Sequence, residues 1–124
     1  MVKILVVDDE KDICNFVQNF FSLRGYKVFT ANNSDEAFIV ADREDPLIIL
    51  QDIRMPGRDG IETLRIMKEK RPNNRVIMVT GVDDMAKMEE ARKLGADTYI
   101  TKPLILEDLV KAVTEAAPKL KPNG

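Results

Sequence analysis

The sequence predicts an α/β fold with three layers, αβα, in which five helices cover both faces of a doubly wound, five-stranded parallel sheet. Five short runs rich in β-branched and other apolar residues alternate with five longer segments of helical pattern, and the connections between them are short. The first run, residues 3–7, is apolar after its initial lysine, which is typical of a strand covered on both faces. Strands that alternate with helices in this way form parallel sheets, because each helix carries the chain back across the sheet.

The N-terminal half contains two strand–helix pairs with clear boundary signals. Apolar residues recur at helical spacing in the first helix and predict a stripe that faces the core: Ile13, Phe16, Val17, Phe20 and Phe21. Gly25 is placed to end that helix, and residues 26–30 are expected to form the second strand. Asn33 followed by Glu36 is a capping arrangement, which predicts the start of a helix that reaches about residue 43.

The remaining elements continue the alternation. A loop with Pro and Gly at residues 55–60 precedes the third helix, and Gly95 closes the fourth. The expected strands are residues 47–51, 75–79 and 97–101, and the expected helices are residues 61–70, 85–94 and 106–117. Because Pro118 ends the last helix, residues 1–118 are expected to form one domain and residues 119–124 a C-terminal tail or linker stub.

The composition excludes several functional classes. At 124 residues, with 44% hydrophobic and 32% charged residues, the chain fits one globular domain. A net charge of −2, from 19 basic and 21 acidic residues without a basic cluster, argues against direct binding to nucleic acid. The only cysteine is Cys14 and there is no histidine, so an internal disulfide, the usual zinc sites and histidine-based acid–base catalysis are excluded.

The sequence contains no evident targeting or membrane segment. Its apolar runs are far shorter than the roughly 20 residues that span a bilayer. Its first residues lack the charged and then apolar layout of an export signal. We therefore expect a cytoplasmic protein that does not enter the membrane.

Reactive or charged residues follow four of the predicted strands. Asp8 and Asp9 follow the first strand, Asp52 the third, Thr80 the fourth and Lys102 the fifth. Ligands of parallel sheets bind beyond the carboxyl ends of the strands, so these side chains are expected to converge there. Three carboxylates repel one another unless a cation offsets them, and magnesium or manganese prefers such oxygen ligands. Single acids after strands also serve as turn formers or helix caps, but that role does not account for all five positions together.

Four short segments carry these residues: VVDDE at residues 6–10, QDIRMPGRDG at 51–60, VTG at 79–81 and TKP at 101–103. They resemble the signature segments of bacterial two-component response-regulator receiver domains, in order and at the usual spacing. The resemblance covers essentially the whole chain and implies a flavodoxin-like fold. The chain is similar to a stand-alone or N-terminal receiver, such as the single-domain regulators of phosphorelays.

The resemblance implies a role for each acid of the predicted site. Asp52 would be the phosphoacceptor, since an aspartate carboxylate can attack phosphorus and form an aspartyl phosphate. Asp8, Asp9 and Asp52 would hold Mg²⁺ or Mn²⁺ together with the backbone carbonyl of Arg54. The metal would offset the charge on the transferring phosphoryl group.

The resemblance also implies roles for residues of the last two strands. Lys102 and Thr80 would bind phosphoryl oxygens, and a cis bond before Pro103 would direct the lysine toward them. An inward movement of Thr80 would leave space for Tyr99, the aromatic partner of this switch. From its strand position alone, Tyr99 is as readily a half-buried residue with its hydroxyl at the surface.

The leading hypothesis is a signalling receiver that accepts a phosphoryl group on Asp52 from a histidine kinase or a histidine phosphotransfer protein. Phosphorylation would switch binding to a downstream protein target or to a missing output domain, and the resemblance also allows a phosphorylation-dependent dimer. Beyond its own phosphotransfer and dephosphorylation, the protein would not be an enzyme.

Two alternative functions stay open from the sequence. An aspartate-nucleophile phosphohydrolase would share much of the site, but such enzymes commonly have a second acid two residues after the nucleophile, where this chain has Arg54. A pseudo-receiver that binds partners without phosphorylation would be favoured by loss of an acid or of the lysine, and all of these residues are present.

Three positions depart from the family pattern, and at one of them Leu47 stands where an acid is common. Gln51 stands where an apolar residue is usual, so its amide needs hydrogen-bond partners within the helix-covered layer. Ile105 stands where a capping Asp or Ser often starts the last helix, which predicts a poorer cap.

Overall fold

The fold is a five-stranded parallel sheet between helices, as the sequence predicts. The computed structural model describes residues 1–55 and 59–117, so the predicted tail at residues 119–124 lies outside the described residues. The strands are β1 (Lys3–Val7), β2 (Lys27–Ala31), β3 (Ile48–Asp52), β4 (Arg75–Thr80) and β5 (Thr98–Thr101). The helices are α1 (Lys11–Ser22), α2 (Ser34–Glu44), α3 (Gly60–Lys70), α4 (Met88–Lys93) and α5 (Leu106–Ala116), with a 3-10 helix at Val82–Lys87. Within the described ranges, no helix is both long and apolar enough to cross a membrane.

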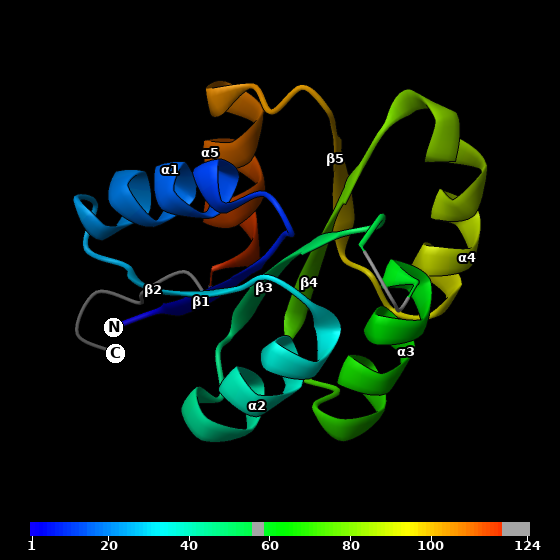
Figure 1. Ribbon diagram of the computed structural model, residues 1–124, viewed down its shortest axis with the longest axis horizontal. Helices are drawn as coiled ribbons and strands as arrows, with labels where there is room; N and C mark the ends of the chain where they lie inside the picture. The colour runs from blue at the N-terminus through cyan, green and yellow to red at the C-terminus, as the bar shows by residue number, and fades with distance from the viewer. Residues whose placement is uncertain (56–58, 118–124) are drawn as a thin grey trace.

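The strand order brings the carboxyl ends of β1 and β3 side by side. The order is β2-β1-β3-β4-β5, and all neighbouring strands are parallel (Figure 1). The chain proceeds from β1 to one edge of the sheet and then builds the other side through β3, β4 and β5, so the strand order reverses next to β1. Ligands of such sheets bind beyond the strand ends at this reversal. The topology therefore places Asp8 and Asp9, which follow β1, next to Asp52 at the end of β3.

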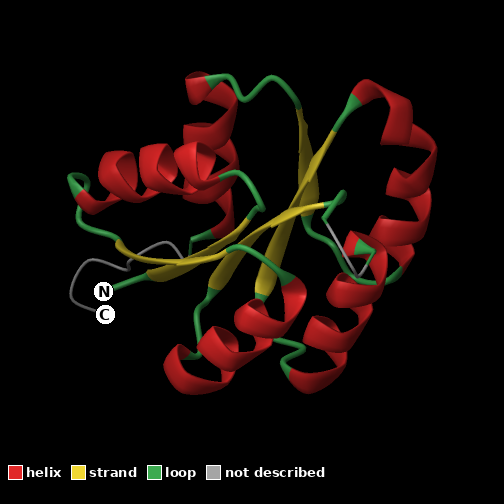
Figure 2. Cartoon of the chain, viewed as in Figure 1, coloured by secondary structure: helices red, strands yellow, loops and turns green. Residues whose placement is uncertain are grey.

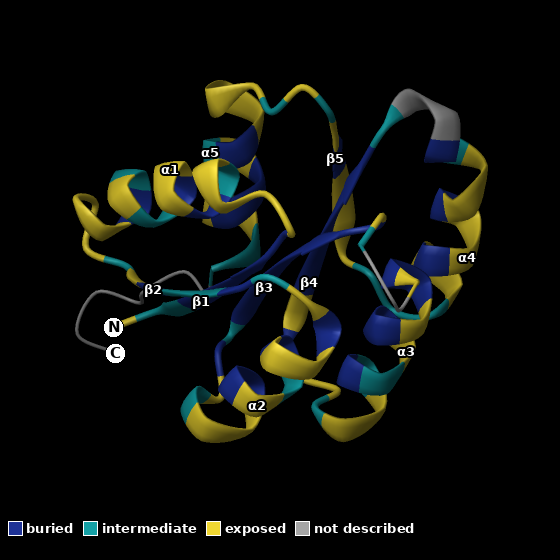
Figure 3. Cartoon of the chain, viewed as in Figure 1, coloured by how far each residue is buried: buried dark blue, intermediate teal, exposed yellow. Residues whose placement is uncertain are grey.

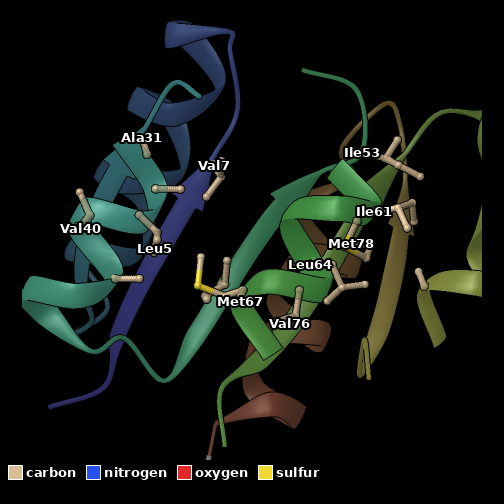
Figure 4. Close-up of a cluster of buried hydrophobic side chains, with 14 of the residues drawn as sticks. Leu5, Val7, Ala31, Val40, Ile53, Ile61, Leu64, Met67, Val76 and Met78 are labelled. Carbon is tan, nitrogen blue, oxygen red and sulfur yellow. The ribbon is translucent and has the colours of Figure 1, made fainter. Parts of the chain in front are cut away.

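Two hydrophobic clusters, one on each face of the sheet, hold the layers together. Helices α1 and α5 cover one face, and α2, α3 and α4 cover the other (Figures 1 and 2). Strands β1, β3 and β4 are almost fully buried, whereas the helices are buried along one side only (Figure 3). Figure 4 shows the cluster under α2 and α3, where Val40, Leu64 and Met67 from these helices pack on the sheet. Removal of this apolar surface from water is the main force that holds the three layers together.

Helix boundaries follow the signals in the sequence. The Asn33 side chain accepts a hydrogen bond from the backbone N–H of Glu36 at 2.8 Å, which confirms the predicted cap of α2. Gly25 after α1 and Gly95 after α4 have φ angles of +90° and +104°, a region that glycine adopts without strain. Ile105 precedes α5 without a side-chain capping bond, as expected for this residue.

Two local predictions are wrong in part. The helix expected at residues 85–94 is α-helical only over Met88–Lys93, because a 3-10 helix, which is common at helix N-termini, occupies Val82–Lys87. Phe16 of the predicted core stripe is 49% exposed. The inward line of α1 passes through the buried Cys14, and Phe16 lies about 200° around the helix from it. The other predicted bounds differ from the structure by no more than one residue.

Candidate functional site

Three acidic side chains meet beyond the ends of β1 and β3. One carboxylate oxygen from each of Asp8, Asp9 and Asp52 lies within 4.8 Å of the others. Asp8 and Asp52 are buried, whereas Asp9 is exposed. The convergence that the strand-end positions predict is therefore present in the structure.

Lys102 contacts this acidic cluster directly. Its Nζ donates to Asp52 Oδ2 at 2.9 Å, and Asp52 Oδ1 accepts the backbone N–H of Arg54 at 3.2 Å. The bond between Lys102 and Pro103 is cis, as expected. Partial burial acts to lower the pKa of Lys102, but its hydrogen bond and attraction to Asp52, with Asp8 adding to the attraction, raise that pKa overall. The lysine is therefore protonated at neutral pH, and it holds the carboxylate of Asp52 in one orientation.

Thr80 and Tyr99 lie on neighbouring strands in different environments. Thr80 is fully buried at the end of β4, and its hydroxyl donates to the carbonyl of Gly81 at 3.1 Å. Its predecessor on β4, Val79, pairs with Asp52, so the hydroxyl lies at the same edge of the sheet as the acids. Tyr99 on β5 is 46% exposed, which matches the surface position rather than the inward one. The exchange between these two residues stays a prediction.

Burial makes the ionised form of Asp8 unfavourable. Desolvation raises the pKa of Asp8 to about 6; the hydrogen bond from the backbone N–H of Glu10 opposes this rise and the charge of Asp52 adds to it. The ionised carboxylate is thus costly at neutral pH even with Lys102 beside the cluster. A divalent cation would remove this cost, and three carboxylates are a donor set that magnesium accepts. The residues present therefore fit a magnesium site.

We expect Asp8→Asn to stabilise the metal-free protein at pH 7 by about 1–3 kcal/mol. The pKa of Asp8 in the folded protein, about 6, lies above its usual 3.8, so the folded state loses stability relative to the unfolded chain as the pH rises through this interval, and the full penalty applies above about pH 6. This penalty is lost as the pH falls below about 4, because the carboxyl is then protonated in both states. The free energy of unfolding of both proteins in urea, measured with a chelator at pH 7 and below about pH 4, tests this expectation. Equal stabilisation at both pH values would contradict the electrostatic explanation.

An ion pair at the rim of the site links the loop after β3 to the 3-10 helix after β4. The guanidinium of Arg54 donates to both carboxylate oxygens of Asp84, from Nε at 2.6 Å and from Nη2 at 3.0 Å. The side chain of Asp84 is only 5% exposed, and its pairing with Arg54 lowers its pKa. Sequence reasoning missed Asp84 because the partners are 30 positions apart and no spacing pattern connects them.

Gln51 supports the backbone of the residue that follows it. Its side chain is buried, and its Nε2 donates to the backbone carbonyl of Asp52 at 3.0 Å. Nε2 also lies 3.9 Å from Met55 Sδ. The amide thus has the partner that a buried polar group requires, and this departure from the usual pattern is accommodated beside the site.

Comparisons with known proteins agree with this geometry. The family described as the response regulator receiver domain matches residues 4–114. Sporulation initiation phosphotransferase F of Bacillus subtilis (strain 168) is 37% identical over 121 residues, which cover 98% of this chain and 97% of that protein.

Solved structures of receivers have the same fold. A response regulator receiver domain protein from Clostridium thermocellum superposes with a TM-score of 0.88 at 32% identity, over 94% of each chain. Chemotaxis protein CheY4 of Vibrio cholerae superposes with a TM-score of 0.88 at 28% identity, over 94% of this chain and 99% of that one. The fold, the cluster of acids with its lysine and the match over residues 4–114 agree, and the chain belongs to the response regulator receiver domain family of phosphorylation-activated signalling modules.

Proposed function

We propose that this receiver accepts its phosphoryl group on Asp52, with Mg²⁺ or Mn²⁺ held by Asp8, Asp9, Asp52 and the backbone carbonyl of Arg54. The observation that carries the proposal is the meeting of three carboxylates and Lys102 at one point of the sheet edge. The donor is a histidine kinase or a histidine phosphotransfer protein of the cytoplasm. The relationship to a protein named as a phosphotransferase supports a role in phosphate relay.

In the transfer step, a carboxylate oxygen of Asp52 attacks the phosphorus of the donor. An O–P bond forms, and the bond from phosphorus to the donor nitrogen breaks with its electron pair on the nitrogen. Asp52 is held for this attack by Lys102 and by the N–H of Arg54. The protonated lysine then attracts the phosphoryl oxygens as charge develops on them. When bound, the divalent cation offsets the negative charge of both the acids and the phosphoryl group.

The response to phosphorylation begins at Thr80. Its hydroxyl exchanges the carbonyl of Gly81 for a phosphoryl oxygen, and the space that it leaves admits Tyr99. The inward movement of this exposed tyrosine changes the surface around β5. The partner that reads this surface is a downstream protein, an output domain or a second copy of the chain. A protein partner is favoured over nucleic acid because the chain has a net charge of −2.

Removal of magnesium should stop phosphorylation without unfolding the protein. With Mg²⁺ and acetyl phosphate, we expect the intact mass to rise by one phosphoryl group. With excess EDTA the mass should stay unchanged, since Lys102 alone does not offset the charge of the three acids and the donor. The circular dichroism spectrum should be the same in both samples, because the two hydrophobic clusters do not depend on the metal. Equal labelling with EDTA would contradict the metal requirement.

Intact mass, together with an assay for phosphomonoester hydrolysis, separates the receiver from the two alternative functions. A phosphohydrolase would hydrolyse phosphomonoesters with repeated turnover, and a pseudo-receiver would keep its unmodified mass with Mg²⁺ present. Arg54 occupies the position of the second acid of the phosphohydrolases, and its guanidinium is bound to Asp84. The family assignment and this pairing both favour the receiver.

A further inference from the structure

A single peptide unit connects two of the three acids of the site. Asp8 and Asp9 are consecutive, so the orientation of the peptide between them sets the directions of both side chains. One of these side chains is buried and the other exposed, yet both offer an oxygen to the same cluster. The contacts of this peptide therefore bear on the geometry of the whole site.

The segment after β2 holds this peptide from the side. Asn32 Nδ2 donates to the backbone carbonyl oxygen of Asp8 at 3.0 Å, across 24 positions of sequence. The thiol of Cys14 donates to the same oxygen at 3.4 Å, and the Asn32 amide lies 3.8 Å from that sulfur. The backbone N–H of Asp8 donates to the carbonyl of Ala31 at 3.0 Å. Residues 31 and 32 thus bind the backbone of Asp8 through both its N–H and its carbonyl.

The side-chain amide of Asn32 does not serve as a helix cap. The cap of α2 is supplied by the next residue, Asn33, which accepts a hydrogen bond from Glu36. The hydrogen bond from Asn32 instead reaches another loop and is accepted by the carbonyl of Asp8, which lies between β1 and the exposed Asp9. Two adjacent asparagines therefore have separate roles, one for a helix and one for the acidic peptide.

We propose that Asn32 is a positioning residue for the divalent cation: its amide fixes the peptide between Asp8 and Asp9 so that both carboxylates face the metal. This inference rests on the proposed function, since it assumes that these acids hold Mg²⁺. Like charges in the cluster repel one another and favour an open arrangement when the peptide is free to turn. Metal binding must then bring the carboxylates together again, and the free energy that this requires weakens the affinity for the metal. Removal of hydrogen bonds that orient metal ligands commonly costs about 10–100-fold in affinity.

The test compares Asn32→Ala with Asn33→Ala as a matched control. Magnesium affinity is measured by calorimetry and, independently, by the magnesium concentration that gives half-maximal phosphorylation by acetyl phosphate. We expect Asn32→Ala to weaken both by about 10-fold, while the rate at saturating magnesium stays near that of the unmodified protein. Asn33→Ala loses a helix cap and some stability but should keep the magnesium affinity. Asn32→Leu, which retains the volume without the N–H, should behave like Asn32→Ala and replaces it if that variant does not fold.

The outcomes distinguish the positioning role of Asn32 from the metal site itself. Unchanged magnesium affinity in both Asn32 variants would overturn the inference and leave the metal site intact. Equal weakening in Asn32→Ala and Asn33→Ala would overturn it as well, because the effect would then follow stability rather than the bond to Asp8. Absence of magnesium binding by the unmodified protein would overturn the proposed metal site, and this inference with it.

Discussion

We expect Asp52→Asn to abolish phosphorylation. The substitution preserves the size of the side chain and an oxygen that can accept from Lys102 Nζ, but it removes the negative charge and the nucleophilic oxygen that would attack phosphorus. It also removes a like charge next to Asp8, so the variant should remain folded. Intact mass after incubation with Mg²⁺ and acetyl phosphate should show no phosphoryl group.

The control for this experiment is Asp12→Asn, which changes an exposed acid in the first turn of α1. It should gain one phosphoryl group as the unmodified protein does. Undiminished labelling of Asp52→Asn would assign the acceptor to another residue. Loss of labelling in both variants would show that the change in net charge matters rather than the position.

The second large effect is expected from Gly60→Ala, which should destabilise the protein by about 3 kcal/mol. A Cβ atom on Gly60 would lie 2.6 Å from the carbonyl oxygen of Asp52 and from the Cα and carbonyl oxygen of Ile53. All three are backbone atoms, so no side-chain rotation relieves the overlap. The start of α3 must therefore move away from the end of β3. Thermal unfolding should show a decrease in Tm of roughly 10 °C.

Gly81→Ala is the matched control for this substitution. A Cβ atom on Gly81 would lie 4.0 Å from Asp84 Oδ2, an ordinary van der Waals distance, and its φ of −81° suits alanine. We expect little loss of stability there. Gly60→Ala should also slow phosphorylation, because the displaced backbone carries Asp52. A Tm for Gly60→Ala equal to that of Gly81→Ala would show that the contact at the start of α3 relaxes without cost.

The alternation of elements and the convergence of the acids were predictable from the sequence. Strands and helices follow from local periodicity and from boundary residues such as Gly25 and Asn33, and apart from the start of α4 the structure has them within one residue of the predicted bounds. In a parallel sheet every strand ends at the same edge, so the positions of Asp8 and Asp52 along the chain predict that edge, and the adjacency of β1 and β3 brings the two side chains together. The cis bond before Pro103 was predicted from family resemblance.

Several contacts of the site depended on the tertiary structure. The bond from Asn32 to the carbonyl of Asp8 and the ion pair between Arg54 and Asp84 join residues 24 and 30 positions apart. No periodic pattern encodes such pairs, because each depends on the paths of two separate loops. The close approach of Gly60 to β3 likewise depends on how α3 packs.

Local periodicity predicts the fold class and the edge of the sheet where the chemistry lies, and four short motifs indicate the family. Packing decided which side of α1 is buried. Phe16 has the helical spacing of a core residue, yet the side of the helix that faces the sheet carries Cys14, and Phe16 lies at the surface. The outward position of Tyr99 was decided in the same way, since its strand pattern fits either place. Local sequence sets which residues share a face, and only the packed neighbours determine how much of that face is covered.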